Sequence, residues 1–547
     1  MAGSHRPVVR IFYSKTKLTG VRSRIGERPF IGEFLVYAAL ILASLPARLS
    51  AMRASLWIDE AWVANSILSP SWKEMFYYPR WLQPTPPLFL TIARLVTKVV
   101  GPSEPALRLL PMLAGLIAIP VLAIALRKLF SPVSALCGAS LVIVNFWAIK
   151  YAQQVKQFGA DILASALLVF LITRYCHRPD RRNFALLVGG FVAISFLSTS
   201  AFFMGPSVMA AILLGPLWQV PSQLRAGRLK IAVVSFTLGS VLNYLVFMRP
   251  NRSSDLLAYW AEFCLKPGHP FTSAQALFTS LGELFVPQVS RGTSYVGAAI
   301  VLAVAAGMAI ALIGSVRGSS KAMVILLLGP LPFAVAMAFS VLGLYPLVHS
   351  PRMLLWALPS FAVALAAALE QLLNTFRQRM AREDEPVVFY GTALACFLAV
   401  LAVNVIVIRY PRPSERNSEA VRFLHQSMGP SDLLFVHRRM IEQFDYYSRL
   451  QGWAPRRVYI GQTDWPCCAR TGETYIDTPN IQNYAGELHR TAAQIQPQAR
   501  IWLFLPWGRS DLTWKMEATP DVMQLQSCHE THREDFDQSL VLAYQCR

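Results

Sequence analysis

Two acidic residues stand side by side in a polar segment that follows the first long apolar run of the sequence. Asp59 and Glu60 are flanked by Trp57 and Trp62, and tryptophan favours the boundary between membrane and water. Neighbouring residues on a helix point about 100° apart. One carboxylate can therefore take a proton from a hydroxyl group while the other orients it or binds a metal ion. The alternative is a solvated acidic turn at a helix start, where carboxylates suit the helix dipole.

A second polar segment, residues 150–161, carries Lys150 and Lys156 together with Tyr151 and Gln154. Cations held where a membrane meets water attract an anion, and phosphate forms strong charge-assisted hydrogen bonds with them. The alternative is that both lysines simply extend toward the lipid headgroups.

A third segment, residues 345–352, contains His349 and ends at Arg352, which opens an apolar run. The planar guanidinium group suits two phosphate oxygens at once. A cation at a helix start opposes the helix dipole. The position of Arg352 therefore favours an anionic partner.

The elements that must hold these residues are apolar helices. The 547 residues are 54% hydrophobic and 15% charged, whereas about 25% of an average soluble domain is charged. This composition excludes a disordered chain and disfavours a soluble enzyme. Eleven apolar runs approach the length of about 17–25 residues that crosses a bilayer; they lie near 33–52, 106–126, 133–149, 160–173, 184–203, 204–218, 231–248, 296–314, 322–342, 352–372 and 387–408. Residues 184–218 form either one long helix or two short helices that meet near residues 198–200.

The net charge of +20 indicates the orientation of these spans. If residues 184–218 cross twice, the basic clusters all face one side, and short basic loops favour the cytoplasm. We therefore predict a cytoplasmic N-terminal segment, 1–32, and a membrane domain, 33–409, with a long first outer loop, 53–105. Residues 410–547 follow as an extracytoplasmic (periplasmic) domain. The protein is then a multi-pass inner-membrane protein, and its charge needs no nucleic-acid partner.

The outer domain is predicted to be α/β, because short β-rich runs and one helical run appear in its sequence. Strands are expected at 433–437, 457–460, 500–505 and 540–545, and a helix at 440–450. A surface turn is expected at 529–532. An oxidising compartment permits disulfides, so Cys528 and Cys546 are the favoured pair, with Cys467 and Cys468 in the same domain; four free thiols are the alternative.

These segments together resemble the GT-C superfamily of polyprenyl-phosphate-sugar-dependent glycosyltransferases. The resemblance is to its bacterial branch of protein mannosyltransferase-like, lipid A aminoarabinose and galacturonosyl transferases. It is carried by residues 59–62, by the Pro-rich stretch leading into 87–128, by the loop 151–158, and by Arg352 ahead of Leu354, Leu355 and Pro359. It covers residues 33 to about 375. The sequence lacks a GxxxxGK[ST] loop and a GxGxxG after a strand, so nothing supports nucleotide hydrolysis.

The resemblance implies a fold of about eleven transmembrane helices and an inverting transfer of a sugar to a hydroxyl group of an envelope acceptor. Asp59 is the implied general base, and Glu60 assists it or binds a metal ion. The donor's lipid phosphate is assigned to Lys156, Arg352, Tyr151, Gln154 and His349. No cofactor is certain, and a divalent metal ion held by Asp59 or Glu60 stays open.

The sequence departs from the family pattern at four positions. Thr85 stands where the family commonly has His before Pro-Pro, Gln154 and Lys156 replace Glu and Arg, and Phe158 replaces Tyr. These departures keep open the hypothesis of a catalytically silent partner in envelope assembly. A lipid or polysaccharide transporter (a flippase) is a further alternative.

Overall fold

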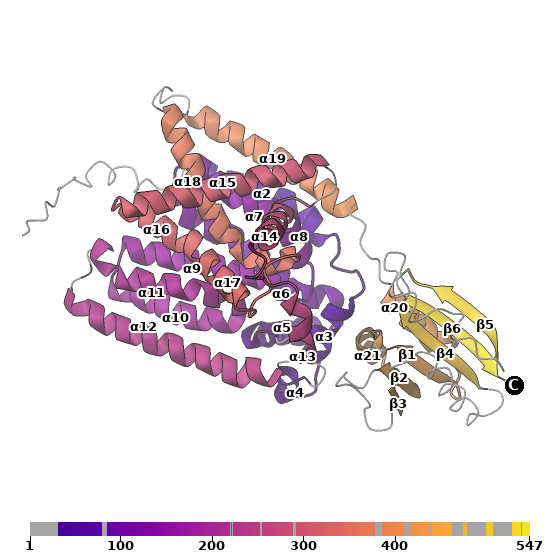
Figure 1. The fold of residues 1–547 in the computed structure, drawn as a ribbon. Coiled ribbons are helices and arrows are strands. Elements are labelled where there is room, and N and C mark those ends of the chain that lie inside the picture. Colours follow the sequence, from indigo (N-terminus) through magenta and orange to yellow (C-terminus); the bar gives the residue numbers. More distant parts are fainter. Residues whose placement is uncertain are drawn as a thin grey trace, which may run out of the picture.

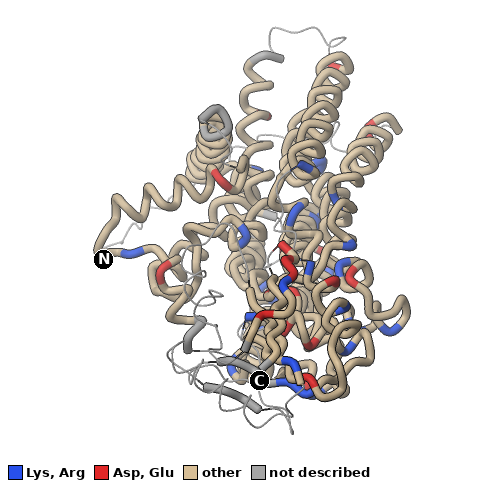
Figure 2. The backbone as a smooth tube through the Cα atoms, turned by 90° about the vertical axis from the view of Figure 1, so that its right-hand side faces the viewer, with Lys and Arg blue, Asp and Glu red and all other residues tan. Residues whose placement is uncertain are grey.

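The computed structural model describes residues 31–78, 85–218, 220, 222–251, 254–287, 291–377, 385–409, 416–437, 439–461, 474–477, 499–506, 528–537 and 539–546. Within these ranges a large body of helices is followed by a sheet, which lies beside that body in Figure 1. Figure 2 shows long stretches of helix that carry no Lys, Arg, Asp or Glu. Such stretches fit a hydrocarbon surrounding, where charged side chains are costly.

Eight described helices are long and apolar enough to cross a membrane, and a bent pair makes a ninth. The eight candidate spans are Ile31–Leu49, Glu104–Arg127, Phe158–His177, Leu224–Asn251, Tyr295–Val316, Ser320–Val341, Pro351–Thr375 and Glu385–Arg409. The bent pair consists of α7 (Pro132–Ile143) and α8 (Phe146–Ala152), which meet at 50°. The predicted class, a multispanning helical membrane protein with a small C-terminal region of mixed sheet, is confirmed.

The predicted count of about eleven spans differs from this result at residues 184–218. Here α10 (Arg181–Leu197) has 17 residues, roughly 25 Å of helix, which is less than the ~30 Å hydrocarbon core. It is followed by the 3-10 helix η1 (Thr199–Met204) and by α11 (Gly205–Leu213). The two parts meet at Ser198, whose backbone is extended and whose Oγ donates to Asp161 Oδ1 at 2.5 Å. The extended backbone at Ser198 ends α10, so residues 184–218 are not one continuous helix.

Between the candidate spans Ile31–Leu49 and Glu104–Arg127, the described residues form three short helices, α3 (Ile58–Ile67), α4 (Trp72–Phe76) and α5 (Pro87–Val100). Pro87 occupies the first turn of α5, where a missing N–H costs nothing. One face of α5 is buried, and Arg94 on that face donates to the carbonyl of Ser71 at 3.0 Å. The other face exposes Leu95 and Val99. This amphipathic pattern suits a helix at a membrane surface.

The membrane-domain elements have the following bounds: α2 (Ile31–Leu49), α6 (Glu104–Arg127), α9 (Phe158–His177), η2 (Gly215–Trp218), α12 (Ser222–Leu242), η3 (Asn243–Met248), η4 (Arg249–Asn251), α13 (Ser254–Ala261), α14 (Pro270–Phe285), α15 (Arg291–Val316), α16 (Ser320–Leu328), α17 (Pro330–Val341), η5 (Pro351–Ala357), α18 (Leu358–Arg377) and α19 (Glu385–Arg409). The spans α6 and α9 pack along each other. The N-terminal ends of both helices, at Glu104 and Phe158, lie near the acidic segment.

The C-terminal sheet has the strand order β3-β2-β1-β4-β6-β5. Four of its six strands were expected: β1 (Leu433–His437), β2 (Arg457–Gly461), β4 (Arg500–Pro506) and β6 (Ser539–Cys546). The first four strands in this order pair in parallel, and β6 and β5 pair antiparallel. Helices α20 (Asn417–Ser427) and α21 (Ile441–Leu450) accompany the sheet.

Two strands were missed. They are β3 (Thr474–Asp477) and β5 (Cys528–Asp535). The predicted surface turn at 529–532 is wrong, because these residues belong to β5. That strand pairs only with β6 in the described sheet and is exposed from His529 to Asp535. An exposed edge strand can be polar on both faces, so no apolar alternation marks it in the sequence.

The sheet region is attached through α21 to α3 and to the residues around it. The Leu56 N–H donates to Tyr447 Oη at 2.7 Å, and Asn65 Nδ2 donates to Glu442 Oε2 at 2.9 Å. The Tyr78 hydroxyl donates to the same Glu442 oxygen at 2.9 Å. Helix α3 therefore lies between the membrane helices and α21, and the sheet region fixes its position.

Candidate active site

Asp59 and Glu60 lie in the first turn of α3. The helix begins after Trp57, whose backbone is extended. The free N–H groups of a first turn favour carboxylates. Both residues are buried, with 8% of Asp59 and 2% of Glu60 exposed. The solvated acidic turn is therefore wrong for this pair, and each carboxylate needs a partner.

Glu60 is held from two sides. Arg108 of α6 donates from Nε to Glu60 Oε1 at 2.8 Å and from Nη2 to Oε2 at 2.7 Å. The Val155 N–H also donates to Oε1, at 2.8 Å. Arg108 Nη1 additionally binds the carbonyl of Ala54 at 2.6 Å. Glu60 thus joins α3, α6 and the loop before α9.

Asp59 faces a different cation. Arg352 Nη1 lies 3.1 Å from Asp59 Oδ2, and 17% and 11% of the two side chains are exposed. The guanidinium of Arg352 also lies over the ring of Trp260, 5.1 Å from its centre. This pair is more accessible than Glu60 and Arg108, each of which exposes 2% of its side chain. Of the two carboxylates, Asp59 is therefore the one that solvent or a ligand can reach more readily.

Lys156 is brought to the same place by the tight turn between α8 and α9. Its N–H donates to the Gln154 carbonyl at 2.7 Å, and 1% of the residue is exposed. Burial lowers the pKa of Lys156 because the charged form loses its water. The neighbouring carboxylates of Asp59 and Glu60 oppose this shift, and Arg352 reinforces it.

Aromatic rings pack against one another on both sides of the turn that carries Lys156. Tyr151 stacks on Trp147 with ring centres 5.9 Å apart and meets Phe158 edge-on at 5.0 Å. Lys150 places its Nζ 5.0 Å from the Trp147 ring centre. Gln154 has a buried Oε1 without a hydrogen-bond partner. A buried polar atom in this state calls for a ligand or water.

His349 differs from Asp59 and Glu60 in its exposure to solvent. It is exposed, and its backbone is left-handed at φ 59°. Its N–H donates to Ser280 Oγ at 2.8 Å, which anchors the turn ahead of Arg352. The ring lies edge-on to Phe263 at 6.5 Å. The structure thus places His349 in the turn that carries Arg352.

Three contributors were not found in the sequence. Arg108 interrupts an apolar helix near its N-terminal end, which is the signal that could have identified it. Trp260 and the Val155 N–H carry no such signal, because only the folded chain brings them to the acids. Within the residues that the structure describes, no three His, Cys, Asp or Glu side chains form a group that could hold a metal ion.

The arrangement combines one carboxylate that can accept a proton with two cations that can hold an anion. Asp59 contacts Arg352, and Lys156 is close enough to both for their charges to act on it. Cations fixed where water is scarce stabilise developing negative charge strongly. These are the groups required to transfer a substituent from a phosphate to a hydroxyl.

Comparison with known proteins gives a family match over part of the chain and solved structures of similar fold. Residues 84–244 match the family of dolichyl-phosphate-mannose-protein mannosyltransferases. The crystal structure of ArnT from Cupriavidus metallidurans in the apo state is similar over 94% of this chain and 98% of that one, with 14% identity and a TM-score of 0.54. ArnT bound to undecaprenyl phosphate has the same coverage and TM-score at 15% identity. The oligosaccharyltransferase of Archaeoglobus fulgidus, with zinc and sulfate, is 13% identical, with a TM-score of 0.48 over 85% of this chain and 67% of that one. No curated protein sequence matches.

Proposed function

We propose that this chain, a membrane glycosyltransferase of the GT-C superfamily, moves a sugar from a polyprenyl-phosphate donor to an acceptor hydroxyl. The acceptor is a glycolipid, polysaccharide or protein of the cell envelope. The family match and the ArnT-like fold support the class of enzyme. Undecaprenyl phosphate bound to ArnT supports the class of donor.

One observation carries the proposal: the accessible Asp59–Arg352 pair lies beside the buried Lys156. An incoming lipid phosphate competes with Asp59 for Arg352, because a phosphate accepts both arms of a guanidinium. When the phosphate binds Arg352 and Lys156, the Asp59 carboxylate is released. The donor thus frees the base that the next step requires.

In the transfer step, the acceptor oxygen attacks C1 of the sugar from the face opposite the phosphate. A new bond forms between C1 and the acceptor oxygen, and the bond between C1 and the phosphate oxygen breaks. Asp59 takes the proton of the hydroxyl as general base. The leaving phosphate keeps the bonding electrons, and Lys156 and Arg352 stabilise its added charge.

Glu60 has a different role from the one the sequence suggested. Its oxygens already accept from Arg108 and from the Val155 N–H. We assign it to positioning, since Val155 directly precedes Lys156. Tyr151 and Gln154, in the same loop, would contact the donor, and His349 would act through the turn that places Arg352.

The orientation is also part of the proposal. The positive-inside rule would place residues 1–32 in the cytoplasm and the sheet region in the periplasm. Residues 33–409 would form the membrane domain and 410–547 the outer domain. Asp59 belongs to α3, the helix to which α21 is attached. The reaction would therefore occur at the outer face.

The test uses the full chain, purified and reconstituted with a labelled polyprenyl-phosphate sugar and envelope extract. Asp59→Asn should lose sugar transfer by about a hundredfold or more, which is the usual loss for a general base. Arg352→Ala should weaken binding of undecaprenyl phosphate. Wild-type transfer by Asp59→Asn would contradict the assignment of the base.

Two control variants match these changes. Glu74→Gln alters an exposed acid of the same outer loop, and Lys266→Gln alters an exposed base outside the site. Both should keep full activity. Donor binding without turnover over a panel of acceptors would instead support a silent partner, and donor movement across vesicles without product would support a flippase.

A further inference from the structure

A cavity lies between α6 and α9 at the end of these helices that is opposite to Asp59. Its volume is about 470 Å³, and it is lined by Ile124, Lys128, Phe170, Arg174, His177, Arg178 and Asn183. Counting along α6 from Arg108 to Lys128, the cavity is about 30 Å from the candidate active site at 1.5 Å per residue. It therefore belongs to the other membrane face.

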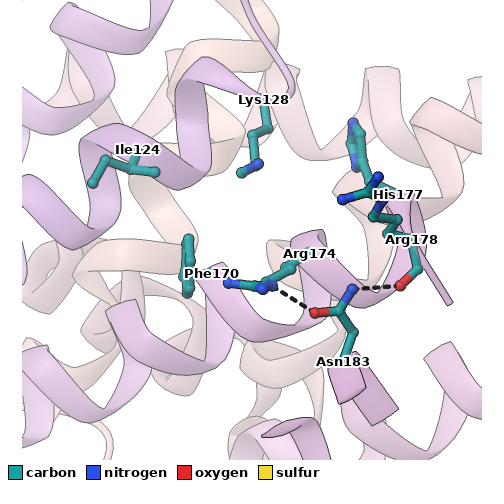
Figure 3. A pocket seen from close by; sticks show the side chains of 7 residues that line it. All are labelled: Ile124, Lys128, Phe170, Arg174, His177, Arg178 and Asn183. Atoms are coloured by element: carbon teal, nitrogen blue, oxygen red, sulfur yellow. Dashed lines mark hydrogen bonds between the residues drawn. The ribbon is translucent and has the colours of Figure 1, made fainter. Parts of the chain in front are cut away.

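The polar half of this cavity is basic. Lys128, which directly follows α6, and Arg174 of α9 extend into it, as Figure 3 shows. His177 and Arg178, at the C-terminal end of α9, also line it. None of the lining residues is acidic. Asp180, the nearest acid along the chain, caps α10 by accepting from the Asn183 N–H at 2.7 Å.

The cavity is held open by a small hydrogen-bond network. Arg174 Nε donates to Asn183 Oδ1 at 2.6 Å, and Asn183 Nδ2 donates to the Arg178 carbonyl at 2.7 Å. Both bonds are drawn in Figure 3. Asn183 is 3% exposed, so the start of α10 is fixed against the end of α9. This network fixes the Arg174 guanidinium and the backbone of Arg178 beside the cavity.

The other half of the cavity is apolar and faces the membrane interior. Ile124 lies one helical turn before Lys128, and Phe170 lies one turn before Arg174, so both are deeper along their helices. Half of Ile124 is exposed (53%), as expected of a side chain that contacts lipid. A phospholipid fits this arrangement, because its acyl chains would contact the apolar residues and its phosphate would contact the basic residues.

We propose that this cavity binds the headgroup phosphate of an anionic phospholipid from the leaflet at this end of α6 and α9. Basic pockets between membrane helices are known to hold such headgroups. The positive-inside rule alone would explain the basic residues at this end of the helices. It would explain neither the cavity nor the apolar residues that line it. The proposal is independent of the glycosyl transfer, since it involves none of the residues near Asp59.

The experiment measures lipid binding to the detergent-purified full chain by native mass spectrometry, with phosphatidylglycerol and phosphatidylcholine as probes. Wild type should prefer phosphatidylglycerol. Lys128→Gln with Arg178→Gln should weaken its binding about thirtyfold, from roughly one kilocalorie per cation. Phosphatidylcholine binding should not change.

A matched control removes two charges from the same region without touching the cavity. Arg181→Gln with Arg182→Gln changes exposed residues that are not part of the lining, and it should bind phosphatidylglycerol as wild type does. Equal loss in both double variants would reduce the effect to general surface charge and overturn the proposal. No preference for phosphatidylglycerol in wild type would overturn it as well.

Two further arms identify the source of the phosphate. Ile124→Ser keeps every charge but removes part of the apolar wall, so it should weaken phosphatidylglycerol binding. Millimolar inorganic phosphate should fail to displace the lipid. Displacement, together with unchanged binding by Ile124→Ser, would indicate a soluble phosphate ligand and exclude the lipid.

Discussion

Arg352 Nη1 lies 3.1 Å from Asp59 Oδ2, although 293 residues separate the two in the sequence. Asp59 comes from the first turn of α3, and Arg352 from the start of η5. The adjacent carboxylate of Glu60 pairs instead with Arg108 and is closed to solvent. The two acids therefore have different surroundings, and this difference underlies the roles that we propose for them, Asp59 as the reacting group and Glu60 as a positioning residue.

The buried Glu60–Arg108 pair should respond strongly to the loss of one partner. Arg108→Met leaves an unpaired buried carboxylate, at a cost of about 3–5 kcal/mol. The double variant Glu60→Gln with Arg108→Met should recover much of this, because it removes both charges. Thermal unfolding in detergent measures the four members of this cycle. Additive effects would show that the pair is not coupled.

Lys156 should give donor binding an alkaline limit. Its buried ammonium has a lowered pKa, so it loses its proton at a lower pH than an exposed lysine. The affinity for undecaprenyl phosphate should therefore fall as the pH rises through this lowered pKa. Lys156→Arg should remove the fall, since a guanidinium stays charged. Asp59→Asn should move it to still lower pH, because that carboxylate raises the pKa of Lys156. A limit that stays in Lys156→Arg would exclude Lys156 as its source.

Gly159 marks the closest approach of α9 to α6. A Cβ placed there would overlap the carbonyl of Pro111 and could not be accommodated by turning a side chain. Gly159→Ala should therefore lower thermal stability and, by moving the loop that carries Lys156, weaken donor binding. Gly189→Ala is the matched control, because a Cβ at that helical glycine would meet nothing within 4 Å. Equal stability of the two variants would contradict the close contact.

Cys528 and Cys546 should form a disulfide when the protein is made in cells. They occupy directly paired backbone positions of β5 and β6, and directly paired strand residues lie about 4.5–5.5 Å apart at Cα, within the range for a disulfide. Thiol labelling before and after reduction, with Cys528→Ser as control, measures it. Such a bond would also place the sheet region in an oxidising compartment. Two thiols labelled without reduction would oppose both the pairing and the periplasmic location.

The sequence by itself determined the membrane class and most of the local elements. Apolar runs are recognisable because a bilayer demands a minimum length, and β1, β2, β4, β6 and α21 were recognisable because burial imposes a pattern on their residues. The break near residue 198 could be anticipated only as one of two alternatives. The structure places an extended residue, Ser198, at this point, and its side chain bonds to Asp161 of α9.

The site was predicted as a set of residue types, and only the tertiary structure decided their partners. Asp59 and Glu60 look equivalent in the sequence, because both are acids at a helix start. Their difference arises from Arg108 on α6 and Arg352 on η5, which approach α3 from separate helices. Long-range pairs of this kind depend on how helices pack. Packing is set by the whole membrane domain together with α21, and no local segment contains that information.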